Sequence, residues 1–284
     1  MRPVLQKKKR NYKLLVIYIL IAIICIVVIG IALYMQYFQD EKIGVIFGIT
    51  DSEEEDKYNE LKNNFNNIFT NDVENMQDGE LNIQKINQNF DIVATRYKYS
   101  EQTEDITLEA TIPNINIKSD VITEFNEHIK NTYKEQVDKC KASNEGFIYN
   151  VKYKAYVQEN ILSLVIYAEL KEESNNQRLM IETYNYDVVN DKEISLEELL
   201  SLRNIDLKTA NNKIRNEIKQ VKEKNDSLVE LGYNMYQRDY NSDMYDVKNT
   251  KEYFLGMDGD LYVIYPYGNT DSTSEMDIVI FMNK

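Results

Sequence analysis

Four oxygen-bearing side chains follow one another at short intervals near residue 240 and could bind a cation. The set consists of Asp239, Asn241, Asp243 and Asp246. Their spacing matches the first ligands of a calcium-binding loop. The match then ends, because Met244 stands where an EF-hand needs glycine and Thr250 stands where it needs a bidentate glutamate. A bound cation and a solvated loop both stay open, and the sequence predicts no other metal or cofactor site.

Nucleophilic catalysis has few residues to use in this chain. His128 is the single histidine, so a Ser-His-Asp triad would have to use this one residue, and zinc sites with two histidines are excluded. Cys140 lies twelve residues further along the same predicted helix, about 18 Å along its axis, which is too far for a Cys-His pair. The nine glycines form no phosphate-binding loop. We therefore expect a protein that is not an enzyme.

Paired carboxylates are the one catalytic arrangement that the sequence cannot exclude. The chain holds 47 Asp and Glu residues, so neighbouring pairs such as Glu197 and Glu198 are expected by chance. Glycosidase pairs are defined by their separation in space, which a sequence does not show. A cell-wall hydrolase is therefore kept as a less favoured alternative.

The charge of the chain is unevenly distributed. Six of the 33 Lys and Arg residues lie within the first thirteen positions, which leaves 27 basic against 47 acidic residues, a formal charge of -20, in residues 14–284. Such a domain repels nucleic acid and attracts cationic proteins by long-range steering. Solubility is the simpler reason for the same charge.

Residues 14–35 carry no charged side chain and are long enough to span a membrane. Basic residues precede this segment and acidic residues follow it, so the positive-inside rule places residues 1–13 in the cytoplasm as a basic tail. We predict a single-pass protein of the cell membrane whose remaining chain is extracytoplasmic.

A cleaved signal peptide and a lipoprotein signal are two other interpretations of this segment. A cleaved signal peptide is an alternative, since Gly30-Ile31-Ala32 offers a small-x-small site, although the apolar run is longer than usual. Lipidation of Cys25 is rejected, because Ile23 and Ile24 precede it where small residues are needed. Cys25 and Cys140 lie too far apart to form an intrachain disulfide.

Residues 36–89 have the acidic, Asn-rich composition of a stalk. Tyr58, Leu61, Phe65 and Phe69 follow helical spacing and predict an amphipathic helix over 53–74, whose stripe we expect to join the core. The apolar stretch 43–49 is too short to cross a membrane.

The remaining chain, residues 90–284, predicts an α+β domain with a largely antiparallel sheet and packed helices. Alternation predicts strands over 90–99 and 106–112, the second ended by Pro113. A helix should run from Ser119 or Asp120 to about Cys140 and lie on a sheet. Its stripe comprises Val121, Ile122, Phe125, Ile129, Tyr133 and Val137. We expect two lobes, about 90–145 and 146–284.

An antiparallel meander is predicted over 147–158, 161–171 and 178–189. Ser195 and Glu198 form a capping box, Asp206 caps a helix through about Lys224, and a third helix is expected over 228–237. The chain closes with strands over 253–256, 261–267 and 277–282, the first two joined at Asp258-Gly259.

Tyrosine is abundant, at 22 residues, whereas tryptophan is absent. Many of these tyrosines fall on predicted strands, where an aromatic face could bind a glycan or a protein. The favoured interpretation is that they fill the sheet. They are Tyr149, Tyr153, Tyr156, Tyr167, Tyr184, Tyr186, Tyr262, Tyr265 and Tyr267.

Four short motifs resemble the RsiV-like extracytoplasmic domain, which occurs in lysozyme-sensing anti-sigma factors and precedes the catalytic part of PdaC-type peptidoglycan deacetylases. The motifs span 160–164 (NILSL), 183–187 (TYNYD), 194–199 (ISLEEL) and 261–268 (LYVIYPYG). The resemblance covers about residues 90–284 and implies a ligand that is a lysozyme-like cationic protein or cell-wall material. Because thirteen cytoplasmic residues are too few for an anti-sigma domain and the sequence shows no metal-binding catalytic domain after residue 284, we expect neither of these two activities.

The function expected from these observations is a non-enzymatic binding or sensing module, anchored in a bacterial cell envelope. It should bind no nucleic acid and need no cofactor. The alternative is a structural or assembly subunit of a membrane complex, and a wall hydrolase is the third possibility.

Overall fold

The computed structural model describes residues 52–69, 92–143, 145–173, 175–269 and 273–283. The basic tail 1–13, the predicted anchor 14–35 and the apolar stretch 43–49 lie outside these ranges, so membrane insertion and orientation stay predictions. Within the ranges described, every helix is too short or too polar to cross a membrane.

The chain divides into two compact units, Met1–Asn59 and Glu60–Lys284. Helix α3 (Ser52–Asn63) contains the boundary between them. All packing described below lies within the second unit.

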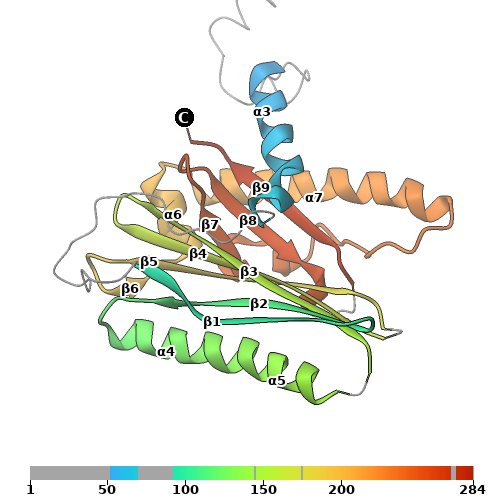
Figure 1. The fold of residues 1–284 in the computed structure, drawn as a ribbon. Helices are drawn as coiled ribbons and strands as arrows, with labels where there is room; N and C mark the ends of the chain where they lie inside the picture. The colour runs from blue at the N-terminus through green and yellow to red at the C-terminus, as the bar shows by residue number, and fades with distance from the viewer. Residues whose placement is uncertain (1–51, 70–91, 144, 174, 270–272, 284) are drawn as a thin grey trace, which may run out of the picture. The chain divides into compact units, whose positions relative to one another are not determined.

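A six-stranded sheet forms the centre of this unit (Figure 1). Its strands lie in the order of the sequence, and all neighbours are antiparallel except β2 and β3. The strands are β1 (Val93–Gln102), β2 (Ile106–Ile115), β3 (Phe147–Gln158), β4 (Ile161–Glu172), β5 (Arg178–Asp187) and β6 (Lys192–Glu193). The predicted α+β class, largely antiparallel sheet and meander are confirmed. The parallel pairing of β2 and β3 was not predicted.

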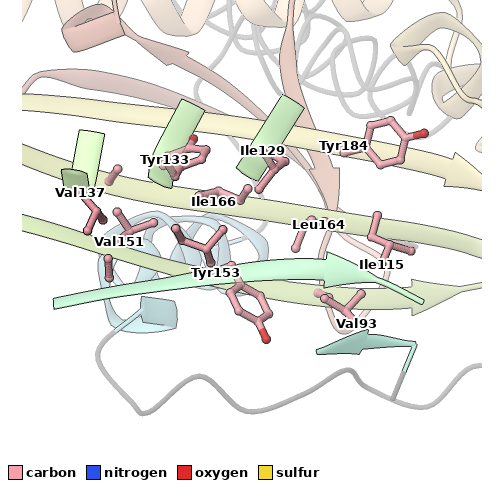
Figure 2. Packing of buried hydrophobic residues seen from close by; sticks show 14 of the residues in the cluster. Val93, Ile115, Ile129, Tyr133, Val137, Val151, Tyr153, Leu164, Ile166 and Tyr184 are labelled. Carbon is pink, nitrogen blue, oxygen red and sulfur yellow. The ribbon is translucent and has the colours of Figure 1, made fainter. Parts of the chain in front are cut away.

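One helical segment covers a face of the six-stranded sheet, as the sequence predicts (Figures 1 and 2). It consists of α4 (Asp120–Ile129), a π-helical turn η3 (Lys130–Lys134) and α5 (Glu135–Ala142). Ile122, Ile129 and Tyr133 are buried against the sheet, in the expected stripe. The prediction that Val121 belongs to this stripe is wrong, since the residue is 38% exposed. One residue corresponds to about 100° around a helix, which turns Val121 away from Ile122.

The prediction that Pro113 ends the second strand is wrong. Strand β2 continues to Ile115, and Pro113 lies opposite Thr95 in β1. The register shifts between Thr95 and Tyr97, which leaves Arg96 as a bulge beside the proline. Proline is tolerated in a sheet at such an irregularity, because the missing N–H is not needed for a regular ladder.

Strands β3 and β4 are paired from Phe147↔Glu172 to Gln158↔Ile161. Glu159 and Asn160 form the two-residue turn with φ values of 48° and 70°. Two consecutive left-handed residues match the twist of a hairpin, which is why Asn is favoured there. The predicted turn at this position is confirmed.

The last three strands form a separate sheet, which the sequence did not indicate. They are β7 (Glu252–Leu255), β8 (Leu261–Pro266) and β9 (Met276–Phe281), all antiparallel. One face packs on α6 (Leu196–Leu202) and α7 (Leu207–Glu230) in a second core. The other face meets the six-stranded sheet, where Tyr156 of β3 stacks on Phe254 of β7 at 5.8 Å between ring centroids.

Both predicted helix caps in this region are confirmed. The hydroxyl of Ser195 accepts from the backbone N–H of Glu198, and the Glu198 carboxylate accepts from the backbone N–H of Ser195. Asp206 accepts from the N–H of Thr209 at 2.9 Å. Each cap satisfies N–H groups that have no partner within the helix.

The third helix expected over 228–237 is absent from the described structure. Helix α7 continues to Glu230 and then stops, because Gly232 adopts a φ of 92°. The N–H of Tyr233 bonds to the carbonyl of Leu228, and the N–H of Gly232 bonds to that of Val229, which is the Schellman arrangement. Among the residues described after Gly232, the helices are the short η4 (Asp243–Tyr245) and η5 (Val247–Asn249) before β7, and η6 (Tyr267–Asn269) after β8.

Two aromatic residues of the predicted stalk belong to the core of the second unit. Helix α3 ends at Asn63, and Phe65 and Phe69 lie in the short helix η1 (Phe65–Phe69). Both rings are buried, at 1% and 4% exposed. Phe69 stacks on Tyr167, and Phe65 contacts the ring of Phe254 at 6.2 Å. The expectation that this stripe packs in the core holds for these two residues, whereas residues 70–74 are not described.

The division into lobes at about residue 145 does not coincide with the two cores. Strands from both sides of that position form one sheet, and both sides contribute to the core under α4 and α5. The second core begins with Ile161 and includes α6, α7 and β7–β9.

A buried hydrogen-bond network joins the two sheets. Ser163 of β4 donates to the side-chain oxygen of Asn185 of β5 at 2.6 Å. Asn185 donates to the carbonyl of Tyr253, and the N–H of Leu255 donates to Ser163. Ser163 and Asn185 belong to the first two motifs, so a structural role accounts for both residues.

Replacing Asn185 with alanine should lower the free energy of unfolding by about 2 kcal/mol, because the buried carbonyl of Tyr253 would lose its donor. Urea denaturation of the wild type and the variant measures this difference. Asn175→Ala, at an exposed position, serves as the control and should change stability by less than about 0.5 kcal/mol. Equal stability of the two variants would show that the network is unimportant.

Candidate functional site

The segment formed by α4, η3 and α5 is called the covering helix below. A cavity of about 350 Å³ lies between the covering helix and the edge of the six-stranded sheet. Its wall combines residues of η3, α5, β3, β5 and β7, together with the end of η6. The lining residues are Thr132, Tyr133, Gln136, Tyr149, Met180, Ile181, Glu182, Glu252 and Asn269. We call this site the π-turn cavity.

The π-helical turn supplies one wall of the cavity. Thr132 and Tyr133 lie within this turn, and Gln136 follows it in α5. A π turn inserts an extra residue into the helix, which is tolerated mostly where function requires a particular side-chain direction. Here it allows Ile129, Tyr133 and Val137 to share the buried face while Tyr133 also reaches the cavity.

Glu182 is held by two neighbours from the covering helix. Its Oε1 lies 2.8 Å from Nε2 of His128, and its Oε2 accepts from the hydroxyl of Tyr133 at 3.1 Å. Burial raises the pKa of Tyr133 well above its ordinary value, and the charge of Glu182 adds to the effect. Tyr133 therefore stays protonated and acts as a donor to the carboxylate.

Glu252 of β7 lines the cavity beside β5, which in the described structure pairs with β6 only at Tyr186 and Asp187. Its Oε2 accepts from the backbone N–H of Thr183 at 2.8 Å and from the hydroxyl of the same residue at 3.2 Å. Among the described residues, Oε1 has no hydrogen-bond partner. Burial raises the pKa of Glu252 to about 7, and the nearby charge of Glu182 contributes to the same shift.

Tyr149 presents an unpartnered polar group to the cavity. Its side chain is 1% exposed and lines the wall from β3. Its hydroxyl forms no hydrogen bond with any residue in the described ranges. A hydroxyl at the wall of a cavity can accept a hydrogen bond from a ligand.

The wall therefore contains two carboxylates and no Lys or Arg. Two tyrosine rings, Met180 and Ile181 supply its apolar surface. A buried acid with a perturbed pKa in a concave site is the combination that most often marks function. The arrangement suits a small cationic group with an apolar stem.

The four residues of the predicted cation loop are not brought together as a ligand set. Asp239 accepts from the backbone N–H of Asn241 at 3.0 Å. Asp246 instead accepts from the guanidinium of Arg215 at 2.7 Å, so its charge is already paired. Asp243 begins η4, and its carbonyl accepts from the side chain of Asn249. In the described ranges no three His, Cys, Asp or Glu side chains are arranged to hold a metal ion.

His128 and Cys140 lie on the same helical segment, as predicted, and are not neighbours. His128 is 59% exposed and contacts Glu182, whereas Cys140 is buried beside Gln136. Burial raises the pKa of the Cys140 thiol, which lowers its reactivity at neutral pH.

The strand tyrosines form no exposed binding face. Eight of the nine are less than 9% exposed, and Tyr167 is partly covered by Phe69. Tyr184 stacks on Phe125, and Tyr245 and Tyr265 pack against each other in the second core. The interpretation that these side chains fill the sheets is confirmed.

Neither carboxylate of the cavity was predicted from the sequence. Glu182 carried a usable signal, because it alternates with Met180, Tyr184 and Tyr186, which face the covering helix. An acid at such an inward position is unusual unless it is paired or functional. Glu252 carried no comparable signal, since its partner Thr183 lies 69 residues earlier in the chain.

Comparisons with known proteins show no matching family model and no matching curated protein. The fold shares a partial similarity with the crystal structure of a DUF3298 family protein from Pseudomonas aeruginosa PAO1, at 12% identity and a TM-score of 0.37, over 66% of this chain and 86% of that one. A DUF3298 family member from Bacteroides fragilis NCTC 9343 is similar at 14% identity and a TM-score of 0.31, over 62% of this chain and 79% of that one. Both of these structural neighbours are therefore DUF3298 family proteins.

Proposed function

We propose that this chain is a non-enzymatic binding or sensing module of a bacterial envelope, anchored through residues 14–35, and that its ligand is a lysozyme-like cationic protein. The observation that carries the proposal is the π-turn cavity, whose wall holds Glu182 and Glu252 without any basic residue. The resemblance of the four motifs to RsiV-like domains supports the same ligand class.

The acidic excess of residues 14–284 favours a cationic partner over an anionic wall polymer. Charge of this size raises the association rate with a cationic protein and repels polyanions. The burial of the strand tyrosines also removes the aromatic face that a glycan would need. Cell-wall material is therefore the weaker of the two ligand classes.

The full-length chain, in a neutral detergent, should bind a cationic lysozyme saturably at an ionic strength of about 0.15 M, where the screening length is about 8 Å. Surface plasmon resonance with immobilised chain measures this binding, with purified peptidoglycan as the second analyte. If binding is seen at low salt and lost at physiological salt, the acidic charge serves solubility rather than specific recognition of lysozyme. Absence of any binding would favour the assembly role instead.

A wall hydrolase is the second candidate, because two carboxylates share the cavity and one of them has a pKa of about 7. A raised pKa is what a general acid requires. Against this role, both oxygens of Glu182 are already engaged by His128 and Tyr133. Release of reducing ends from peptidoglycan, lost in Glu252→Gln, would establish the hydrolase and overturn the proposed binding role.

A further inference from the structure

We propose that the π-turn cavity binds the terminal ammonium group of a lysine side chain, with Glu182, Glu252 and the hydroxyl of Tyr149 as its acceptors. This inference rests on the proposed function and deepens it, because the cationic partner would supply the lysine. It assigns the recognised chemical group and the residues that recognise it.

The charge of the cavity selects a cation. Glu182 and Glu252 both line the wall, and no Lys or Arg does. The nearest basic partner of Glu182 is His128, whose side chain is 59% exposed and lies outside the set of lining residues. A cation inside the cavity would compensate charge that the protein itself leaves unpaired.

The free acceptors favour an ammonium over a guanidinium group. A guanidinium binds best to a carboxylate with both oxygens free, because its donors form a rigid fork. Oε2 of Glu252 already accepts from Thr183, and both oxygens of Glu182 have partners. An ammonium has three donors that rotate freely, and it can use single acceptors from three different residues.

The remaining wall suits the methylene stem of lysine. Met180, Ile181 and the ring of Tyr133 provide apolar surface beside the carboxylates. A lysine stem packs well against such surface while its charged end finds polar partners, and tyrosine rings attract an ammonium through their faces. A volume of about 350 Å³ lies at the small end of ligand pockets, which fits one side chain.

The charged and titratable groups around Glu252 come from three elements of the wall and from its own neighbour along the chain. Glu182 lies on β5, Tyr133 on the π turn, Tyr149 on β3, and Lys251 precedes Glu252 on the chain. A bound ammonium lowers the pKa of Glu252 from about 7 and favours its ionised form. Binding should therefore release a proton near pH 7 and strengthen as the pH rises through that value.

The test uses the full-length chain in neutral detergent with two matched pairs of probes. The first pair is a cationic lysozyme and the same protein with its lysines converted to homoarginine, which keeps the charge and removes the ammonium groups. The second pair is N-acetyl-lysine methylamide and its Nε-acetyl derivative. We expect the unmodified lysozyme and the lysine amide to bind, and their modified counterparts to lose about tenfold or more.

Glu252→Gln is the first variant, because glutamine can still accept from Thr183 while the charge is lost. Affinity for lysozyme should fall by about 10- to 100-fold. Calorimetry in buffers of different ionisation enthalpy should show proton release for the wild type and none for this variant. Glu109→Gln, on an exposed position of β2, is the control and should behave as the wild type.

Tyr149→Phe is the second variant, and it removes no hydrogen bond of the described fold. It should weaken lysozyme binding by about 3- to 10-fold without changing the unfolding transition. The lysine site would be overturned if both variants bound lysozyme as tightly as the wild type does, and if the wild type bound homoarginine-containing lysozyme as tightly as unmodified lysozyme. The proposed function would still stand in that case, provided that unmodified lysozyme bound. Binding of the lysine amide without lysozyme binding would retain the site and overturn the proposed function.

Discussion

Replacing Arg238 with alanine is expected to lower the free energy of unfolding by about 3 to 5 kcal/mol, the usual cost of breaking a buried ion pair from one side. The Arg238 side chain is 3% exposed and Asp277 is 5% exposed. Nε and Nη2 of Arg238 donate to the two oxygens of Asp277 at 2.7 and 3.0 Å. The variant leaves this carboxylate buried, and among the described residues its remaining donor is the hydroxyl of Tyr267.

The position of Arg238 explains why its loss should be so damaging. It lies in the chain between Gly232 and β7 that forms no long helix, and it attaches this segment to β9. The guanidinium also bonds to Glu275 at 3.1 Å and lies 4.8 Å from the ring centre of Tyr267. Arg238 therefore helps to order a connection that has little regular structure of its own, together with Arg215, which bonds to Tyr240 and Asp246.

Denaturation in urea at pH 7 measures this effect. The double variant Arg238→Met, Asp277→Asn is the matched control, because it removes both charges and should be more stable than Arg238→Ala. A loss below about 1 kcal/mol in the single variant would contradict the structural role assigned to the pair.

The variant Glu252→Gln should be more stable than the wild type at pH 8, by about 3 kcal/mol. The pKa of Glu252 rises from an ordinary 4.5 to about 7 in the folded protein, chiefly through burial. A shift of this size corresponds to about 1.4 kcal/mol for each pH unit. Glutamine keeps the acceptor for Thr183 and removes the penalty for a buried charge.

The sign of this effect follows from proton binding. Between pH 4.5 and 7 the folded state holds the proton of Glu252 whereas the unfolded state has released it. The stability of the wild type therefore falls as the pH rises through this window, and above about pH 7 the penalty is constant. The advantage of the variant should be absent at pH 4 and complete at pH 8.

Thermal unfolding from pH 4 to pH 8 tests the prediction, with Glu109→Gln at an exposed site as the control. The difference in melting temperature between the control and the wild type should stay constant from pH 4 to pH 8. A Glu252→Gln curve parallel to that of the wild type would show that the carboxylate is ionised without penalty.

Ionised Glu252 thus lowers the stability of the fold, and the same charge would bind the proposed cationic ligand. Burying a carboxylate without a cation is unfavourable, and proteins keep such groups mainly at sites of function. The cationic ligand proposed for the cavity would reverse the penalty, since it favours the ionised carboxylate. Added lysine amide should accordingly raise the melting temperature of the wild type more at pH 8 than at pH 5.

Local structure was largely predictable from the sequence. Alternating side chains defined β3, β4 and β5 to within two residues, and the capping box at Ser195 fixed the start of α6. These signals depend on neighbours along the chain, whose chemistry a sequence shows directly. The predicted end of α7 at about Lys224 is too early, because Leu228 and Val229 continue the helical pattern and the stop signal is Gly232.

Long-range organisation was not predictable in the same way. Nothing in β7, β8 and β9 shows that they avoid the first sheet, because strand pairing depends on packing partners that are distant in sequence. The cavity combines β3, β5, β7 and the π turn for the same reason. The spacing of the oxygen-bearing residues near residue 240 suggested a cation site. The sequence does not show that Asp246 forms an ion pair with Arg215, which is distant in the chain.

The parallel contact between β2 and β3 has a consequence for how the protein folds. The β1–β2 hairpin and the β3–β4–β5 meander each join segments that are close in sequence, so each can form rapidly. Ile106 and Phe147 begin the parallel ladder that joins them, and the whole of α4, η3 and α5 lies between. We expect closing this connection to be the slow step, so amide hydrogens of the β2–β3 ladder should gain exchange protection later during refolding than those within the hairpin and the meander.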